Sequence, residues 1–338
     1  MSQRWKSAVY QYVRHHNRME VEYTIEPLPD FVADKAYIRM QNNRLSRIAQ
    51  AHKDRKLRPS QCQTRVKFLH LTERGDEAEV YLQLHKLHNY GPRHVEQKIE
   101  REKLNLREQN GRWLITAVSV DLSEKNEASR WVPEAKTPSP IPYVFPEAAG
   151  RTQPGPYLNQ QILSSEPLPR PVKYDRWKAQ QYAEAHWNRP NPAFVDMEVD
   201  CSNFVSQCLY AGGAPMNYTG RRDNGWWYKG LQQHQELWSY SWSVAQSLQA
   251  YLSSSKAGLR AQAVESPYQL AIGDVITYDW DGDSRYQHSV IVTAHAPDGA
   301  PLVNARTTDS RHRYWEYKDS YAWTERTKYK FFHISDYF

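Results

Sequence analysis

The sequence has few cysteines, no long apolar run and no spacing typical of a metal site. Only three of its 338 residues are cysteine, namely Cys62, Cys201 and Cys208, too few for the disulfide framework of a small secreted protein. None of them stands in a Cys/Cys or Cys/His spacing that would hold zinc, so we expect no structural metal. No apolar run approaches the roughly 18 residues that span a bilayer, and the first residues do not read as a secretory signal. We therefore expect a cytoplasmic protein with no membrane span.

Positive charge is concentrated at the beginning of the chain. The formal net charge is +6, and residues 1–60 hold 12 Lys and Arg against 6 Asp and Glu, whereas the remainder is balanced. Within this segment, NRLSRIAQAHKDRKLR would form a basic helical face suited to nucleic acid or anionic lipid. No helix-turn-helix, zinc-finger or RNA-binding signature accompanies it. A solvated helix surface is the favoured interpretation, and we do not expect a nucleic-acid partner.

Proline divides the chain into two parts. Ten of the 20 prolines fall between Pro133 and Pro171, and proline both removes a backbone donor and restricts the residue before it. Neither a long helix nor a central strand can pass through such a segment. We therefore predict a linker or extended arm at residues 129–172, an N-terminal domain at 1–128 and a C-terminal domain at 173–338. Each domain is long enough to bury its own core.

The N-terminal domain is predicted to be of the α+β class. Apolar residues have helical spacing in RWKSAVYQYVRHHNRM and in ADKAYIRMQNNRLSRIAQAH. Apolar and polar residues then alternate in TRVKFLHL, EAEVYLQLHKLHNY, HVEQKIEREKLNLREQ and RWLITAVSVDL, which predicts antiparallel strands joined by hairpins. Helices followed by a curved meander resemble, on pattern alone, the cone-shaped nuclear-transport-factor-like (cystatin-like) fold.

The C-terminal domain is predicted to place helices before an antiparallel sheet. KYDRWKAQQYAEAHWN and DCSNFVSQCLYAGG have helical patterns, and DVITYDW, HSVIVTAHA, PLVNART and YKFFHIS read as strands. In the second helix, Asp200 is a good N-cap residue and Gly212 supplies a stop. Cys201 then lies in the first turn, where the helix dipole favours a thiolate. Cys208 lies mid-helix on the apolar face, where burial keeps it neutral.

A thiolate at Cys201 needs a base, and His288 is the candidate because it opens a strand that follows an acidic turn. A third polar group should orient the imidazole. Asn304 and Asp309, on or after the next strand, are both chemically apt. The register across the intervening turn is uncertain by one residue, and a slip of one reverses the two faces of a strand.

Five motifs taken together resemble a known family: DCSNFVSQCLYAGG, GWWY, SYSWSVAQSLQAYL, GDVITYDWDGDSRYQHSVIVT and RTTDSRHRYW. Residues 173–338 resemble the putative amidase domain common in spore-forming bacteria, which is related to the NlpC/P60 cysteine peptidases and amidases and shares their papain-like fold. The resemblance implies a nucleophilic cysteine at Cys201 and a general base at His288. In this family the third residue is often a histidine, whereas the matching position here is Arg306, which cannot accept a proton from imidazole. Asn304 is our substitute, and a Cys/His dyad completed by water or a backbone carbonyl is the alternative.

The aromatic motifs are open to two interpretations. Trp226 and Trp227 would either line a substrate cleft or pack in the core, and we predict them as substrate-binding residues, whereas core packing is favoured for Trp242. DWDGD lacks most of the ligands of a calcium loop, so an acidic turn is favoured.

We therefore expect a cysteine amidase or peptidase that needs no cofactor. The thiolate of Cys201 would attack an amide carbonyl in a small molecule or peptide, and His288 would pass its proton to the leaving amine. The compartment of a spore is an open alternative to the cytoplasm. The rival hypothesis is a papain-like module with a disabled triad that holds a ligand or protein partner, and Arg306 favours it.

Overall fold

One antiparallel sheet runs through both halves of the chain. The computed structural model describes residues 5–91, 94–125, 171–232 and 235–338. Its ten-stranded sheet has the order β1-β2-β3-β11-β10-β9-β8-β12-β7, with β4 paired to β3 beside this path. The strands are β1 (Gln61–Arg74), β2 (Glu77–Asn89), β3 (Val95–Gln109), β4 (Arg112–Val120), β7 (Ala261–Val264), β8 (Val275–Asp279), β9 (His288–His295), β10 (Pro301–Ala305), β11 (Ser310–Tyr314) and β12 (Lys328–Ile334). A separate hairpin is formed by β5 (Tyr228–Gln232) and β6 (Gln235–Trp238).

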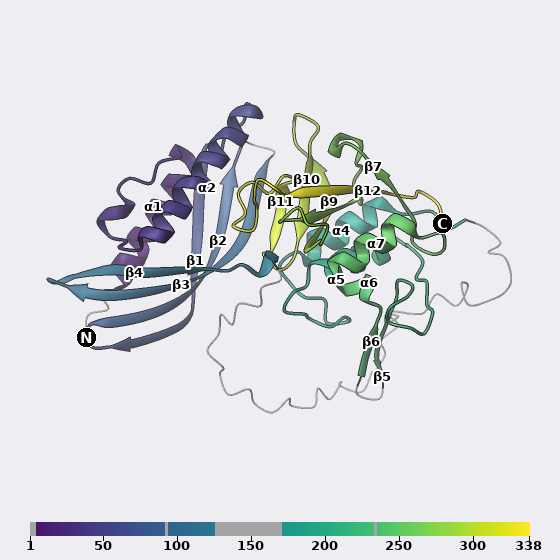
Figure 1. Cartoon of the computed structure of the whole chain (residues 1–338), viewed down its shortest axis with the longest axis horizontal. Helices are drawn as coiled ribbons and strands as arrows, with labels where there is room; N and C mark the ends of the chain where they lie inside the picture. Colours follow the sequence, from purple (N-terminus) through teal and green to yellow (C-terminus); the bar gives the residue numbers. More distant parts are fainter. Residues whose placement is uncertain (1–4, 92–93, 126–170, 233–234) are drawn as a thin grey trace.

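Two long helices cover one face of the N-terminal strands, as Figure 1 shows. They are α1 (Trp5–Glu22) and α2 (Lys35–Asp54), and the side chain of Asp34 caps α2 by accepting hydrogen bonds from the backbone N–H groups of Ala36 and Tyr37. Short 3-10 turns lie at Leu28–Asp30 and Ser123–Lys125. The helices and the sheet enclose a core that includes Tyr12, Leu45, Val80, Leu104 and Ile115.

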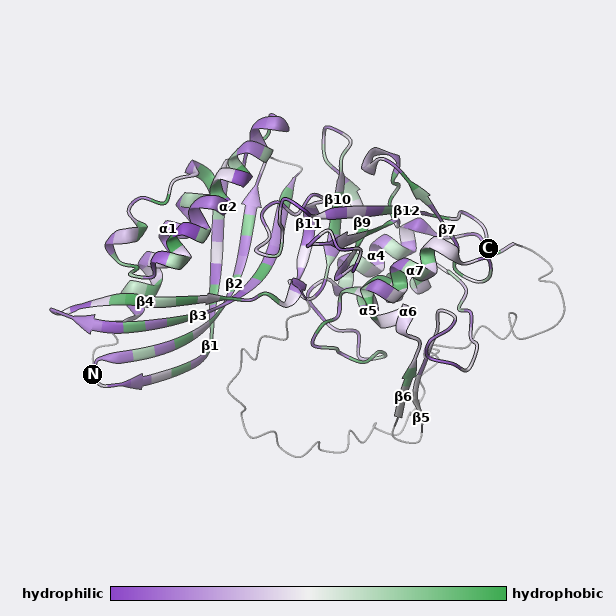
Figure 2. Cartoon of the chain, viewed as in Figure 1, coloured by the Kyte–Doolittle hydropathy of each residue, from purple (hydrophilic) through white to green (hydrophobic). Residues whose placement is uncertain are grey.

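On the side of β2 and β3 that faces the helices, the buried residues change from apolar at one end to charged at the other. At the end of β2 and β3 farthest from the turn that joins them, the buried pairs are apolar, such as Val80 opposite Leu104. Further along they are charged, and Lys86 lies opposite Lys98 at the end close to β11. The hydropathy colouring in Figure 2 shows the alternation of polar and apolar residues along these strands. Buried charge therefore accumulates where the two halves of the chain meet.

The C-terminal strands have helices on one face and an aromatic cluster on the other. The helices are α4 (Arg176–His186), α5 (Cys201–Ala211), α6 (Tyr240–Ser243) and α7 (Ala245–Ser254). Their core includes Phe204, Val275 and Ile291, whereas Tyr278 and Val290 belong to a second core on the opposite face. Neighbouring residues of β8 and β9 thus enter different cores, because side chains alternate along a strand.

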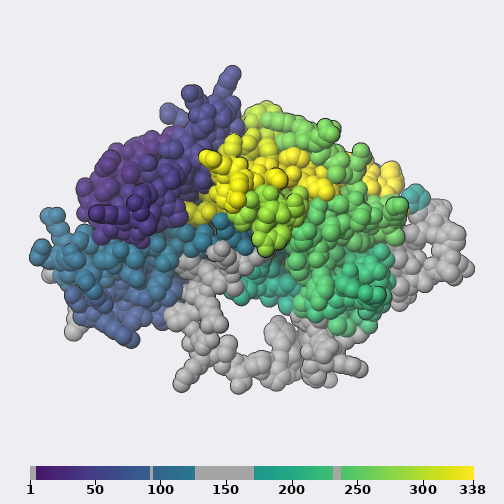
Figure 3. All heavy atoms as spheres, viewed as in Figure 1, coloured from purple at the N-terminus to yellow at the C-terminus, as the bar shows by residue number. Residues whose placement is uncertain are grey.

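The two halves are joined by strand pairing and by buried ion pairs. Strands β3 and β11 pair antiparallel through Lys98 and Ser310. The carboxylate of Asp319 accepts hydrogen bonds from Lys98 Nζ at 2.9 Å and from Arg313 Nε at 3.1 Å. In the space-filling view of Figure 3, the C-terminal segment coloured yellow lies directly against the N-terminal helices coloured purple. Arg44 of α2 donates to the backbone oxygen of Asp319 at 2.7 Å.

The coarse fold agrees with the sequence-based expectation of mixed helices and antiparallel sheet. Strands β8, β9, β10 and β12 and all four N-terminal strands coincide with predicted segments, whereas β11 and β7 were not predicted. The papain-like and nuclear-transport-factor-like assignments remain predictions, as do the domain boundaries. Most of the predicted linker, residues 129–170, lies outside the described residues. Within the described part of the chain, no helix combines the length and apolarity that crossing a membrane requires.

Replacing Asp319 tests the junction between the halves. Asp319→Ala leaves the cations of Lys98 and Arg313 buried without their shared carboxylate, with side-chain exposures of 4% and 3%. Lys98 keeps Glu100 and Arg313 keeps Glu124 as a second partner, so we expect the free energy of unfolding to fall by about 2–3 kcal/mol in urea denaturation. Asp223→Ala breaks an exposed pair with Arg221 and should change it by less than about 1 kcal/mol. Equal effects of the two substitutions would contradict the role assigned to Asp319.

Candidate active site

Cys201 is the first residue of α5 and is almost completely buried. The helix is preceded by Asp200 and ends at Gly212, as predicted. However, the whole of the first two turns is buried, not a single stripe, and Cys201 is only 2% exposed. Its Sγ lies 3.8 Å from Ser202 Oγ and 4.0 Å from the backbone oxygen of Gln287. Figure 1 shows α5 lying against the sheet.

Burial determines the ionisation of both cysteines on α5. Burial raises the pKa of the Cys201 thiol, and hydrogen bonds from Ser289 and Ser202 only partly offset this effect. The lowered pKa predicted from the helix N-terminus is therefore wrong for this conformation, because desolvation outweighs the helix dipole. For Cys208, burial raises the pKa well above its usual value. This direction agrees with the prediction that Cys208 is a buried, neutral thiol.

His288 lies on the face of β9 that points away from α5. Its neighbour Ser289 faces the helix, because Ser289 Oγ is 3.1 Å from Ser202 Oγ. In the register of β8 with β9, His288 is paired with Tyr278, a residue of the aromatic core on the opposite face. The imidazole and the sulfur of Cys201 are therefore on opposite sides of the strand.

Aromatic rings surround the imidazole of His288. The ring centroids of Tyr278, Trp280 and Tyr317 lie 5.5–5.9 Å from that of His288. The residue has no exposed surface, and neither ring nitrogen has a hydrogen-bond partner. Burial, together with the charge of Arg313, lowers the pKa of His288 to about 3. The ring is therefore neutral at physiological pH, and it does not form the predicted dyad with Cys201.

Asn304 lies on the helix side of β10 and contacts other polar groups. Its Oδ1 accepts from Thr293 Oγ1 at 2.8 Å and from the backbone N–H of His312 at 2.9 Å, and its Nδ2 donates to Glu184 Oε1 at 3.0 Å. None of these partners is His288. The predicted role of Asn304 as the residue that orients His288 is therefore contradicted by the face on which it lies.

Arg306 is held beside the beginning of α5 by two carboxylates. Its Nη1 lies 2.9 Å from Asp200 Oδ2, and its Nη2 lies 3.0 Å from Asp196 Oδ1. Asp200 immediately precedes Cys201, so this ion pair fixes Arg306 close to the first turn of α5. Burial raises the pKa of Asp200 to about 6, although the charge of Arg306 counteracts this effect. The carboxylate of Asp200 does not cap the helix.

Asp309, the other candidate for the third position, lies where β11 meets β3. Its backbone oxygen accepts from the N–H of Ile99 at 2.8 Å. Burial raises the pKa of its carboxyl group to about 7, against the opposing effect of Arg306 and Arg101. Because both nitrogens of His288 lack partners, Asp309 does not orient that ring.

Trp226 and Trp227 are parts of the core that supports α5. They are 0% and 2% exposed, which leaves no surface for a ligand. The indole N–H of Trp226 donates to Ser206 Oγ at 3.0 Å, and that of Trp227 to the backbone oxygen of Asn224 at 3.1 Å. The prediction that they bind substrate is wrong for this structure. The core position predicted for Trp242 is confirmed.

The acidic turn before β9 is stabilised by its own backbone. Asp279 Oδ1 accepts from the N–H of Gly282 at 2.8 Å, and Oδ2 from the N–H of Ser284 at 2.7 Å. This agrees with the predicted turn. Within the residues that the structure describes, no group of three or more His, Cys, Asp or Glu is arranged to hold a metal ion.

A polar cluster behind α5 was not predicted. Glu184 of α4 accepts from His312 Nε2 at 2.8 Å and from Arg311 Nε at 2.5 Å, in addition to Asn304. The segment RTTDSRHRYW contains these residues, but β11 itself was not predicted. His312 lies in β11 and has a positive φ of 52°. This local change in backbone direction explains how its side chain reaches Glu184 of α4.

Comparison with known proteins supports the family resemblance for the C-terminal half. Residues 173–332 match the family model described as "Putative amidase domain", so the predicted family is confirmed for that segment. A similar curated protein is "Uncharacterized protein YhbB" of Bacillus subtilis (strain 168), which is 53% identical over 171 residues. This match covers 51% of the present chain, and the chain spans about half (53%) of the relative's length. No solved structure matches the chain.

Replacing His288 by phenylalanine tests its structural assignment. Phe fits an aromatic environment and removes two buried nitrogens without partners, so we expect the free energy of unfolding at pH 7.5 to rise by about 1–3 kcal/mol. Unfolded histidine binds a proton below roughly pH 6.5, whereas folded His288 does so only near pH 3. The wild type therefore loses stability as pH falls through this window, and the advantage of Phe should grow by about 1.4 kcal/mol per pH unit.

The exposed His70 of β1 provides the control, since His70→Phe should change stability by less than about 0.5 kcal/mol. Urea denaturation between pH 4.5 and 7.5 measures both variants. Destabilisation by His288→Phe at every pH would show that the ring has polar partners and would refute this assignment.

Proposed function

We propose that the amidase-family domain at residues 173–332 is catalytically disabled and acts as a binding module. In this proposal it holds the N-terminal part of the same chain, and a small polar ligand is bound between the two parts. The observation that carries the proposal is the orientation of His288, whose ring belongs to the aromatic core opposite α5.

The chemistry at Cys201 supports a disabled site. A cysteine hydrolase requires a thiolate and a base within hydrogen-bonding reach of it. Here burial raises the pKa of Cys201, and His288 is neutral and has no hydrogen bond to any group. Bringing the two side chains together would require the start of β9 to shift by one residue, which would reverse every side chain of the strand.

Arg306 supports the same interpretation. Where an active relative would place a group that accepts the imidazole proton, this chain has a guanidinium that only donates. The guanidinium is engaged by Asp200 and Asp196. It therefore contributes to the structure around the beginning of α5 and not to proton transfer.

A cavity between the two parts of the chain provides the binding site. It has a volume of about 40 Å³ and is lined from the N-terminal side by Glu20, His52 and His88 and from the C-terminal side by Arg313 and Tyr314. This volume accommodates about three water-sized groups. The polar lining includes Nε2 of His88, which is buried without a hydrogen-bond partner. A small molecule with both hydrogen-bond donors and acceptors, such as a simple amide, matches this lining.

The alternative function is a cysteine hydrolase of amide bonds with Cys201 as nucleophile. One observation favours it: Cys201 is the first residue of a helix, and the helix N-terminus is a common position for such nucleophiles. It would require a conformation in which His288 reaches the sulfur.

Alkylation of Cys201 distinguishes the two functions. We expect iodoacetamide at pH 6.5 to modify Cys201 at least tenfold more slowly than glutathione, because the thiol is buried and protonated. Neither His288→Phe nor Arg306→His should change this rate by more than about twofold. Peptide mapping by mass spectrometry follows Cys201 separately from Cys208, the buried control on the same helix.

A hydrolase gives the opposite result: Cys201 reacts faster than glutathione, and His288→Phe abolishes the difference.

The ligand site is probed with acetamide in isothermal titration. Saturable binding that is lost in Ala51→Leu, which fills the cavity, supports the proposal. Release of ammonia from acetamide that depends on Cys201 would refute it.

A further inference from the structure

Cys62 and His88 form a cysteine–histidine pair on neighbouring strands of the N-terminal half. They are directly opposite each other in the antiparallel register of β1 and β2, which places their Cβ atoms about 4.5–5.5 Å apart on the same face of the sheet. Both are buried, with exposed fractions of 8% and 6%. Neither residue belongs to the amidase-family segment.

Helix α1 completes the arrangement with an acid and an amide. Glu20 Oε2 lies 3.7 Å from His88 Nε2, and the same carboxylate is fixed by Arg44 through its other oxygen at 2.7 Å. On the other side, Cys62 Sγ lies 3.5 Å from Asn17 Oδ1. A nucleophile, an imidazole and a fixed carboxylate are thus contributed by two strands and one helix.

The imidazole also faces open space. His88 and Glu20 line the cavity of about 40 Å³ between the two halves of the chain, and Nε2 of His88 is a buried nitrogen without a hydrogen-bond partner. A small molecule that enters this cavity therefore contacts His88, the cross-strand neighbour of Cys62, whereas Cys62 itself does not line the cavity.

We infer that Cys62, His88 and Glu20 form a reactive thiol site whose substrate is a small hydroperoxide. In this site Cys62 is the nucleophile, His88 is the proton donor to the leaving oxygen, and Glu20 positions His88. The site borders the same cavity as the ligand site proposed above, but its chemistry does not involve Cys201 or His288.

The surroundings of the sulfur favour a peroxide over an acyl substrate. Acyl transfer needs N–H donors aimed at the developing oxyanion. The backbone N–H groups of β1 lie in the plane of the sheet, whereas the side chain of Cys62 projects from its face. Cys62 Sγ lies 3.5 Å from Asn17 Oδ1, an acceptor that also receives a hydrogen bond from Thr64 Oγ1 at 2.5 Å. An acceptor suits the O–H of a hydroperoxide, and the cavity volume suits a molecule of that size.

The reaction balances with the hydroperoxide as the sole co-reactant. The thiolate of Cys62 attacks the terminal oxygen of R–O–O–H, an S–O bond forms, and the O–O bond breaks. Sulfur is oxidised by two electrons to sulfenic acid, and the peroxide is reduced to R–O⁻. His88, as imidazolium, gives its proton to R–O⁻, which leaves as alcohol, or as water when R is hydrogen.

The charged groups around His88 favour its protonated form. Burial opposes protonation, but Cys62 and Glu20 outweigh it and raise the pKa of His88 to about 10. The titratable and charged groups that face this region from the N-terminal half are Glu20 of α1, Arg44 and His52 of α2, Arg55 after it, Cys62 of β1, and Glu96 and Lys98 of β3. From the C-terminal half they are Arg313, Glu316, Lys318 and Asp319. Burial lowers the pKa of His52 to about 4, so His52 adds no charge at neutral pH.

Trapping of the sulfenic acid in the full-length chain tests the inference. The protein is treated with limiting hydrogen peroxide in the presence of dimedone, and the three cysteines are mapped by mass spectrometry. We expect Cys62 to be labelled at least tenfold faster than Cys201 or Cys208, with a rate that rises less steeply with pH than that of glutathione, because His88 supplies the proton. His88→Gln should lower the rate at pH 7 at least tenfold, and much less at pH 9.5, where an unassisted thiol ionises.

His85→Gln is the matched control, because His85 lies on the same strand and bonds to Gln97; its rate should equal that of the wild type. Labelling of Cys62 that rises with pH like that of glutathione, or that is unchanged in His88→Gln, would overturn the inference. If His88→Gln does not fold, the pH profile of the wild type decides alone. Rapid labelling of Cys201 bears on the proposed function instead, so the two failures are distinguishable.

Discussion

Side chains of a β-strand point alternately to its two faces, and this alternation along β9 determines the chemistry available to the C-terminal half. It sends Ser289 toward Ser202 at the beginning of α5 and His288 toward Tyr278 in the aromatic core. Both faces of the strand are packed, so a shift of register would bury polar groups and expose apolar ones. The separation of Cys201 from His288 is therefore a property of the whole sheet and not of one rotamer.

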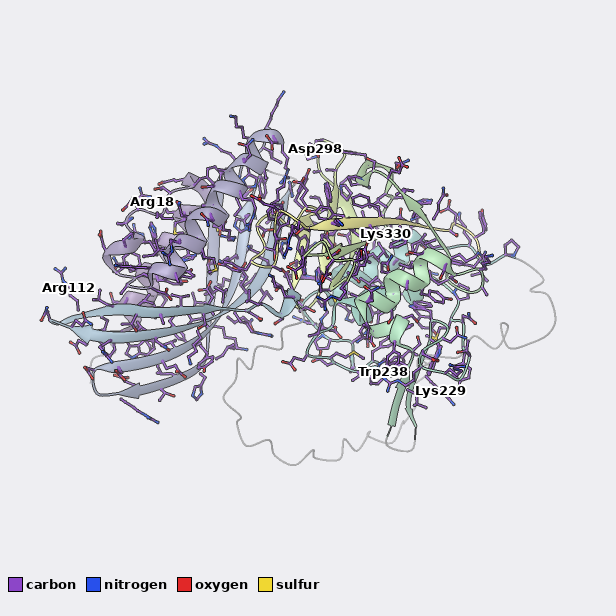
Figure 4. All side chains as sticks on the ribbon, viewed as in Figure 1. Arg18, Arg112, Lys229, Trp238, Asp298 and Lys330 are labelled. Atoms are coloured by element: carbon purple, nitrogen blue, oxygen red, sulfur yellow. The ribbon has the colours of Figure 1, made fainter. Side chains whose placement is uncertain are left out.

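The continuous sheet also explains how the two halves of the chain cooperate. Pairing of β3 with β11 brings the charged end of the N-terminal sheet against the loop that carries Asp319. Lys98 and Arg313 share that carboxylate, and the cavity lined by His88 lies beside them. Figure 4 shows side chains crowded at this junction, whereas Arg18 on α1 and Arg112 at the tip of the β3–β4 hairpin point outward at the periphery. Polar groups are thus concentrated where the two halves meet.

Much of the secondary structure could be predicted from the sequence, because periodicity is a local property. The helical spacing of α2 and the alternation in β2 and β3 appear directly in the residues. The position of Cys201 at the beginning of a helix also followed from Asp200 and Gly212. The pairing of β3 with β11 could not be predicted, because it joins segments some 200 residues apart and β11 is short.

The candidate site was predicted less well than the fold, because two of its features depend on packing. Helix position alone suggested a lowered pKa for Cys201, but burial reverses the direction of the shift. The position of His288 at the beginning of a strand suggested a general base, but the sequence does not reveal toward which face of the sheet its side chain points. The Cys62–His88 pair was missed for the same reason, since cross-strand neighbours depend on the register of β1 and β2.

The ionisation of His288 tests the central claim most directly. In nuclear magnetic resonance of the imidazole signals, with His288→Phe used for assignment, the account predicts that His288 remains neutral from pH 5 to 8, since its pKa is about 3. Alkylation of Cys201 under forcing conditions should leave these signals unchanged. A titration of His288 within this range, together with a change of its signals when Cys201 is alkylated, would contradict the account.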